Sequence, residues 1–183
     1  MKKLLFLGLA IVLSVTACQK QEKRYTQQSP EIDTYKKSIE AYEKRDWEAM
    51  ASHYADTAKI MNNVTEKNGQ NLTELIATNK EDATIFSSWD FVDGESEYEM
   101  VVTDDGETWV NFWGLWQGTL KANNKMHEIP VHLTAQFIDG KIVKEFGYWD
   151  NSKILADMQA MQKAEESAAE ESEMDGDKIP EGE

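Results

Sequence analysis

The segment 137–150 constrains the fold of this chain more than any other stretch. Two runs of strand-forming residues flank the pair Asp139-Gly140. An Asp-Gly pair in this setting is the strongest short-range signal for a β-hairpin, because both residues accept the positive φ angles of a tight turn. The sequence therefore predicts antiparallel strands over 129–138 and 141–149, with the carboxylate of Asp150 at the end of the second strand.

Two further strands are predicted upstream, over 95–103 and 107–120, separated by an Asp-Asp-Gly turn. Alternation along 107–120 divides its large apolar residues between two faces: Trp109, Trp113 and Leu115 on one, Val110, Phe112 and Trp116 on the other. A strand that is apolar on both faces is covered on both faces. We therefore expect one face to contact helices and the other to contact a second copy of the chain.

The first half of the folded region has the spacing of helices instead. Ser29 and Pro30 provide a cap and a first helical residue for an amphipathic helix that carries Ile32, Tyr35, Ile39 and Tyr42 on one side. Asp46 is expected to cap a second, short helix, and Asn71 with Glu74 resembles a capping box for a third. A short strand at 58–61 and a closing helix over 151–163 complete the pattern.

Helices segregated from an antiparallel sheet define an α+β fold. We expect the curved antiparallel sheet to wrap around the N-terminal helices and so to form a conical barrel with a pocket. The predicted domain spans residues 31–163.

Residues 1–17 have the composition of a secretory signal: two lysines, then an apolar run over 4–15 that is too short to span a membrane. Cys18 follows, and it is the single cysteine of the chain. Val15-Thr16-Ala17-Cys18 resembles a bacterial lipobox, which implies that Cys18 is lipidated and becomes the mature N-terminus. An ordinary secretory signal with a chance cysteine is the alternative. Residues 18–30 then read as the lipidated cysteine and a polar tether.

Charge restricts the partners of the mature chain. Loss of residues 1–17 removes two of 19 basic residues, so that 34 acidic residues leave a net charge of −17. Such acidity disfavours nucleic acids and anionic lipid surfaces as partners. Residues 164–183 contain nine acidic residues and one lysine, and we expect this tail to be disordered.

Two motifs at opposite ends of the predicted domain resemble one known family. Residues 42–56 (YEKRDWEAMASHYAD) are similar to the helical start of SnoaL-like domains, members of the nuclear transport factor two-like superfamily. Residues 137–150 resemble the final hairpin of the same domains, in which a Phe-x-Asp-Gly-Lys-Ile turn leads to an aromatic strand that ends in Asp. The resemblance covers about residues 31–160.

The resemblance implies a conical α+β fold with a pocket between sheet and helices. Its enzyme members include polyketide cyclases, and the superfamily also contains isomerases, dehydratases and proteins that bind ligands or dimerise without a known reaction. In the cyclase-like members an Asp at the position of Asp150 acts as the base. Family membership thus defines shape better than chemistry.

Asp150 and His132 are the candidate catalytic residues. Alternation puts Asp150 in phase with Ile142, Phe146 and Tyr148, so it would lie in the wall of the pocket if that face points inward. Burial would then raise its pKa and favour proton transfer. The alternative is that Asp150 caps the last helix. His132, on the partner strand, pairs with Asp150 or polarises a substrate only if its face lines the pocket.

Tyr148, Phe146, Trp113 and Trp109 are the candidate ligand-binding residues, and core or dimer contacts are the alternative role for such aromatics. The three histidines lack the spacing of metal ligands, and we expect neither a metal nor a cofactor. The favoured interpretation is a homodimeric lipoprotein of the cell envelope, outer membrane favoured where one exists, that binds a small apolar or amphipathic molecule. A cyclase, isomerase or dehydratase that uses Asp150 as base is one alternative, and a non-catalytic interaction module is another.

Overall fold

The computed structural model describes residues 24–176, so the predicted signal peptide, Cys18 and most of the tether lie outside the described residues, as do residues 177–183. The helices are α2 (Pro30–Glu43), α3 (Trp47–Ser52), α4 (Leu72–Ile85) and α5 (Ser152–Gly176), with one 3-10 turn at Glu66–Asn68. The strands are β1 (Tyr25–Thr26), β2 (Tyr54–Asn62), β3 (Gln70–Asn71), β4 (Phe86–Phe91), β5 (Glu97–Val102), β6 (Thr108–Leu120), β7 (Met126–Ile138) and β8 (Lys141–Trp149).

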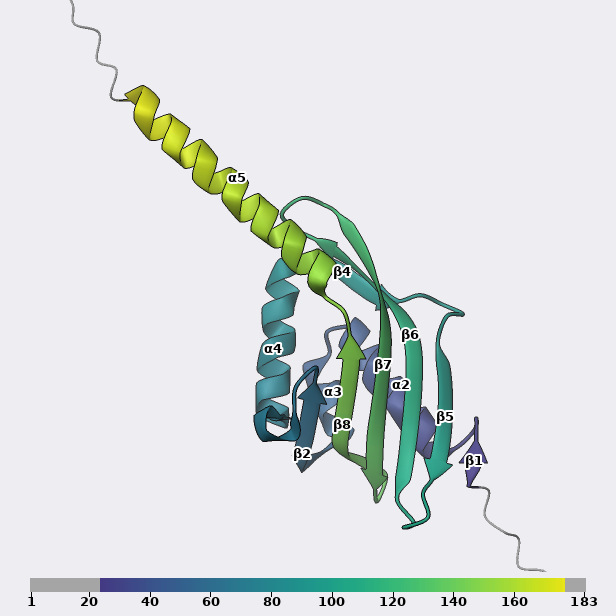
Figure 1. Cartoon of the computed structure of the whole chain (residues 1–183). Helices are drawn as coiled ribbons and strands as arrows, with labels where there is room; N and C mark the ends of the chain where they lie inside the picture. The colour runs from purple at the N-terminus through teal and green to yellow at the C-terminus, as the bar shows by residue number, and fades with distance from the viewer. Residues whose placement is uncertain (1–23, 177–183) are drawn as a thin grey trace, which may run out of the picture.

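One curved sheet contains all of these strands, in the order β1-β5-β6-β7-β8-β2-β3, with β4 paired to β6. Its concave side holds α2 and α3, while α4 lies beside β2 (Figure 1). The predicted α+β class and the curved sheet around N-terminal helices are confirmed. The pairing is antiparallel except between β2 and β8, which run parallel because β2 reaches the sheet from the helical region and not through a hairpin.

The predicted local signals appear in the structure with their expected contacts. Ser29 Oγ accepts the amide of Ile32 at 3.2 Å, which starts α2. Asn71 and Glu74 form a complete capping box at the start of α4. The β7–β8 turn has φ angles of 51° at Asp139 and 74° at Gly140, as an Asp-Gly hairpin requires.

A β-bulge in β8 changes which of its side chains face the core. Phe137 pairs with Ile142 and Gln136 pairs with Lys144, so Val143 is an extra residue without a partner position. Glu145, four per cent exposed, is therefore on the concave side with Ile142, whereas strict alternation would place it on the opposite face. Phe146 and Tyr148 turn to the outer face. The expectation that Ile142, Phe146 and Tyr148 share one face is wrong for this reason.

Apolar side chains fill the inside of the cone. Tyr35 and Ile32 of α2 pack with Phe112 of β6 and Ile60 of β2, and all four are at most one per cent exposed. A second cluster at the other end joins Trp89 and Trp116 to the buried Ile154 of α5. Full burial of each large apolar side chain contributes about 1.5–3 kcal/mol. The cone is thus a packed core.

Helix α5 projects from one end of the sheet, and β1 lies near the opposite end (Figure 1). The first turns of α5 are held by the buried side chain of Ile154 and by Asp157. The Asp157 carboxylate lies 2.5 Å from Lys125 Nζ and 3.1 Å from His127 Nε2. The helix continues past Lys163 to Gly176, which differs from the expected disorder of the acidic segment. Ala and Glu are abundant there, and both have high helix propensity. Within residues 24–176 no helix is long and apolar enough to cross a membrane.

Candidate functional site

The one glutamate inside the core of the described chain lies between two tyrosines. Glu145 Oε2 accepts hydrogen bonds from Tyr35 Oη at 2.9 Å and from Tyr54 Oη at 3.0 Å. The three residues come from β8, α2 and β2, so the cluster ties the helix to two strands of the sheet. A buried carboxyl group would be costly without such partners.

The surroundings shift the pKa values of all three groups. Burial raises the pKa of Glu145 to about 7, and the hydrogen bonds from Tyr35 and Tyr54 partly oppose this rise. Burial, followed by the charge of Glu145, holds the pKa of each tyrosine well above its ordinary value. A carboxyl group that titrates near neutral pH suits proton transfer.

The Glu145 cluster is nevertheless closed to a substrate. Tyr35 is one per cent exposed and Tyr54 five per cent, and Ile60 and Ile142 have no exposed surface. Two hollows of the described part of the chain lie on its outer surface, and Glu145 lines neither. The predicted conical pocket is therefore occupied by the protein's own side chains.

Asp150 lies at the surface and contacts the start of α5. Its Oδ1 accepts the backbone amide of Ser152 at 2.9 Å, and the residue is exposed. Hydrogen bonding with Ser152 and the charge of Lys153 hold the pKa of Asp150 below its ordinary value. This bond to the amide two residues on forms an Asx-type turn directly before α5, in which Asn151 accepts the first helical hydrogen bond. The expectation that Asp150 lies in the wall of an apolar pocket is not met, because the bulge in β8 breaks the alternation on which it rested.

His132 lies on the outer face of the sheet, in one cross-strand row. Residues Glu97, Trp113, His132 and Tyr148 are successive partners on β5, β6, β7 and β8. The His132 ring stacks on Trp113 at a centroid distance of 4.9 Å and on Tyr148 at 6.3 Å. Its Nδ1 lies 3.0 Å from the carbonyl oxygen of Phe112. His132 is thus placed among aromatics on the outside, and not beside Asp150 in the cone.

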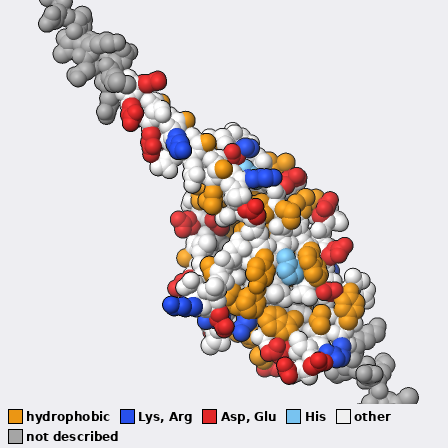
Figure 2. Space-filling model, viewed as in Figure 1, with side chains coloured by type: hydrophobic (Ala, Val, Ile, Leu, Met, Phe, Trp, Pro, Cys, Tyr) orange, Lys and Arg blue, Asp and Glu red, His pale blue; other side chains and the backbone are white. Residues whose placement is uncertain are grey.

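The four predicted ligand-binding aromatics share this outer face. Trp109 stacks on Phe146 at 6.2 Å, next to the Trp113–His132–Tyr148 row. Figure 2 shows hydrophobic side chains around a histidine on this side of the sheet, with acidic side chains at the border. Trp113 is 41% exposed and Tyr148 is 54% exposed. These four residues share the outer face and do not line the inside of the cone, and their ligand-binding role stays a prediction.

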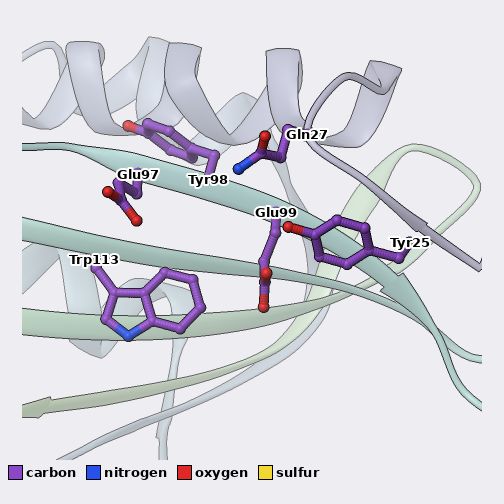
Figure 3. Close-up of a pocket in the computed structure, with 6 residues that line it drawn as sticks. All are labelled: Tyr25, Gln27, Glu97, Tyr98, Glu99 and Trp113. Carbon is purple, nitrogen blue, oxygen red and sulfur yellow. The ribbon is translucent and has the colours of Figure 1, made fainter.

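A hollow of about 290 Å³ lies at the β1–β5 edge of the outer face. It is lined by Tyr25, Gln27, Glu97, Tyr98, Glu99 and Trp113. Figure 3 shows Trp113, Glu97 and Glu99 on one side of the sheet, the Tyr25 hydroxyl directed toward Glu99, and the Tyr98 ring turned toward the helix. Two exposed rings and two carboxylates thus surround one space. We call this hollow the edge pocket.

A second hollow, of about 460 Å³, lies between the loop at Asn68–Gln70 and the outer side of α4, where Glu74 and Glu81 line it. No aromatic residue lines it. Its lining therefore offers no ring face on which a ligand could stack. The edge pocket is therefore the stronger candidate binding site.

Sequence reasoning missed Glu145 and Tyr25. Tyr35 was recognised as a core residue, but the bulge at Val143 hid the inward direction of Glu145. Tyr25 falls in the predicted tether, and two residues of pairing with β5 bring it to the sheet. Glu145 follows Lys144 in the sequence, so no local pattern distinguished it from a charge that faces solvent.

Comparison with known proteins agrees with this architecture. No protein-family model matches the sequence, and no curated protein matches it. The matching solved structures include several described as putative polyketide cyclases, among them the following two. One, from Xanthomonas campestris, has a TM-score of 0.58 and 14% identity, and the match covers 72% of this chain and 98% of that chain. The other, a SnoaL-like protein from Shewanella denitrificans, has a TM-score of 0.55 and 15% identity over 73% and 99% of the two chains.

A third structure, a nuclear transport factor two-like protein of unknown function from Burkholderia pseudomallei, has a TM-score of 0.55 and 15% identity, covering 70% of this chain and 97% of that chain. At these identities the similarity establishes the fold and not the activity. The chain therefore has the conical α+β fold of the nuclear transport factor two-like proteins, which the SnoaL-like polyketide cyclases share.

Proposed function

We propose that this chain is a lipid-anchored, extracytoplasmic domain that binds a small amphipathic molecule in the edge pocket. The observation that carries this proposal is the pairing of the exposed rings of Trp113 and Tyr25 with a hollow of about 290 Å³. Rings beside polar groups can contact both the apolar part and the polar part of an amphipathic molecule. The binding site is thus on the outer face of the sheet and not inside the cone.

The packed cone supports this location. A ligand near Glu145 would have to displace Tyr35, Phe112 or Ile60, each of which is fully buried. Leaving such side chains unpacked costs several kcal/mol, typically about 2–5 for each large residue. The rings of the edge pocket are already exposed, so a ligand there covers apolar surface without displacing any of the core.

The membrane anchor is proposed from the sequence. Val15-Thr16-Ala17-Cys18 has the pattern of a lipidation site, and several acyl chains on Cys18 would hold the domain at a membrane surface. The residue after Cys18 is Gln19 and not the aspartate associated with retention in the inner membrane, which favours the outer membrane in a bacterium that has one. A Cys18→Ala variant is expected to leave the membrane fraction on cell fractionation. Retention of this variant in the membrane fraction would contradict the anchor.

The homodimer remains a prediction as well. Tyr148 and Phe146 leave apolar surface at the β8 end of the outer face, which a second copy would cover. This arrangement keeps the β1–β5 edge free for a ligand. Native mass spectrometry of the purified protein reports the oligomeric state and any retained ligand together.

Binding is tested with three probes of similar shape that differ in charge: the cation choline, the neutral 3,3-dimethylbutan-1-ol and the anion 3,3-dimethylbutanoate. We expect at least one to bind saturably with one site per chain, measured by saturation-transfer NMR of the probe methyl groups. The branched methyl end matches an aromatic wall, so affinities in the millimolar range or better are expected, about −4 kcal/mol. Absence of saturable binding by all three would contradict the proposed function.

An enzyme of the cyclase, isomerase or dehydratase type is the second candidate, with Glu145 in place of Asp150 as general base. The observation that favours it is a carboxyl group with a pKa of about 7 beside two phenols. A substrate would require the cone to open. A reaction that a Glu145→Gln variant still catalyses would exclude this role.

A further inference from the structure

We infer that the ligand of the edge pocket carries an organic ammonium group. This inference rests on the proposed function, and it adds the charge and chemical class of the ligand. It follows from the carboxylates, the aromatic rings and the positions of the nearest basic groups.

The two carboxylates of the edge pocket lack basic partners among residues 24–176. Neither Glu97 nor Glu99 forms an ion pair with any described residue, and Glu99 accepts a hydrogen bond from the side-chain amide of Asn111 at 3.1 Å. The nearby Arg24 pairs with Asp104 at 2.7 Å. Two like charges side by side on one strand favour a cation between them.

Lys36 is a second basic group near this region within residues 24–176, and its ammonium group already contacts an aromatic ring. Its Nζ lies 5.0 Å from the centroid of the Tyr98 ring, which is turned toward α2. This ammonium group therefore occupies the helix side of β5. The outer side, where Glu97 and Trp113 are register partners, has no basic side chain among the pocket-lining residues.

The aromatic rings select the kind of cation. His132 stacks against Trp113 on the β7 side, with an interplanar angle of 25°, which leaves the indole open toward β5 and Glu97. Tyr25 closes the other end of the pocket (Figure 3). Aromatic faces attract alkylammonium groups by cation–π interaction and cover their methyl groups. A calcium or magnesium ion would instead require about six oxygen ligands, and the edge pocket offers two carboxylates.

The three probes of similar shape separate charge from shape. Choline is expected to bind about tenfold more tightly than the neutral 3,3-dimethylbutan-1-ol, because both carboxylates attract the cation at a solvated site. The anion 3,3-dimethylbutanoate is expected to bind most weakly. Phosphocholine should bind less tightly than choline, because its phosphate is repelled, and this distinguishes a free ammonium compound from a phospholipid headgroup.

A double variant, Glu97→Gln with Glu99→Gln, should bind choline no more tightly than the alcohol. Glu128→Gln, on β7 outside the edge pocket, is the matched control and should retain the choline preference. Equal binding of all three probes would overturn the ammonium inference and leave the proposed function standing. Binding of none would overturn both. A choline preference that persists in the double variant would overturn the assignment to these carboxylates.

Discussion

The stability of the protein is expected to fall by about 3 kcal/mol between pH 4.5 and pH 7 relative to a Glu145→Gln variant. Burial raises the folded-state pKa of Glu145 from 4.5 to about 7, so the folded protein holds a proton that the unfolded chain releases in this range. The side-chain amide that this substitution introduces keeps an acceptor for Tyr35 and Tyr54 and does not titrate.

The direction of this effect is set by which state binds the proton. Below pH 4.5 the carboxyl is protonated in both states, and its contribution is fully present. As pH rises to about 7, unfolding releases this proton, and the free energy of unfolding decreases. Above that pH the loss is complete. Acidic groups with lowered pKa values, such as Asp157, act in the opposite direction and cancel in the comparison with the variant.

The measurement is the free energy of unfolding by denaturant at several pH values for the wild type and the Glu145→Gln variant. Glu128→Gln, an exposed glutamate of β7, serves as a control that should follow the wild type. Parallel pH profiles for the wild type and Glu145→Gln would contradict the burial of Glu145 as an acid with a raised pKa.

A Trp113→Ala variant is expected to lose probe binding by at least about tenfold, because the indole lines the edge pocket and provides a cation–π contact. Trp113 is 41% exposed and lies on the outer face, so the change removes its stack on His132 and leaves the core inside the cone intact. We expect the free energy of unfolding to fall by about 1–3 kcal/mol, as in other substitutions that remove a partly buried ring. Binding is measured by saturation-transfer NMR with the tightest of the three probes.

The matched control is Trp109→Ala, on the same strand and the same outer face but outside the edge pocket. It removes an indole of equal size that stacks on Phe146. Binding should remain at the wild-type level. Equal losses in the two variants would mean that the outer face as a whole, and not the edge pocket, governs binding.

Local signals made most of the fold predictable. The Asp139-Gly140 turn, the Ser29 cap and the Asn71–Glu74 capping box depend on residues within a few positions of one another, and all three appear as expected. The alternation of 107–120 correctly separated Val110 and Phe112 from Trp109 and Trp113. Such features are set by short-range sterics and by burial, which a sequence displays directly.

The features that failed depend on pairing between distant strands. Val143 is an extra residue in β8, so every side chain after it lies on the side of the sheet opposite to the one that alternation predicts. Glu145 therefore enters the core, and Phe146 and Tyr148, which were expected in the pocket wall, lie on the outer surface. No local pattern marks this bulge. The strand at β4 was also missed, since Phe86 continues the apolar stripe of α4 and only pairing with β6 makes it a strand.

The candidate site was predictable only as a set of residue types. Trp113, Tyr148 and His132 were singled out, and cross-strand pairing places them in one row. Alternation shows which residues share a face of the sheet. It does not show which face packs on α2, so it leaves open whether these residues lie inside the cone or outside it. Tyr25 joins the edge pocket through two-residue pairing of β1 with β5, too short to be recognised in sequence.

The location of the ligand is the central claim, and the six tryptophans of the chain report on it directly. Trp113 lines the edge pocket, whereas Trp89 and Trp116 lie in the cone and are at most nine per cent exposed. The measurement is a titration of the ¹⁵N-tryptophan-labelled protein with choline, with the indole resonances assigned by single Trp→Phe variants. We predict a saturable shift of the Trp113 resonance while those of Trp89 and Trp116 stay in place. Shifts of Trp89 and Trp116 without a shift of Trp113 would contradict the account and place the ligand in the cone.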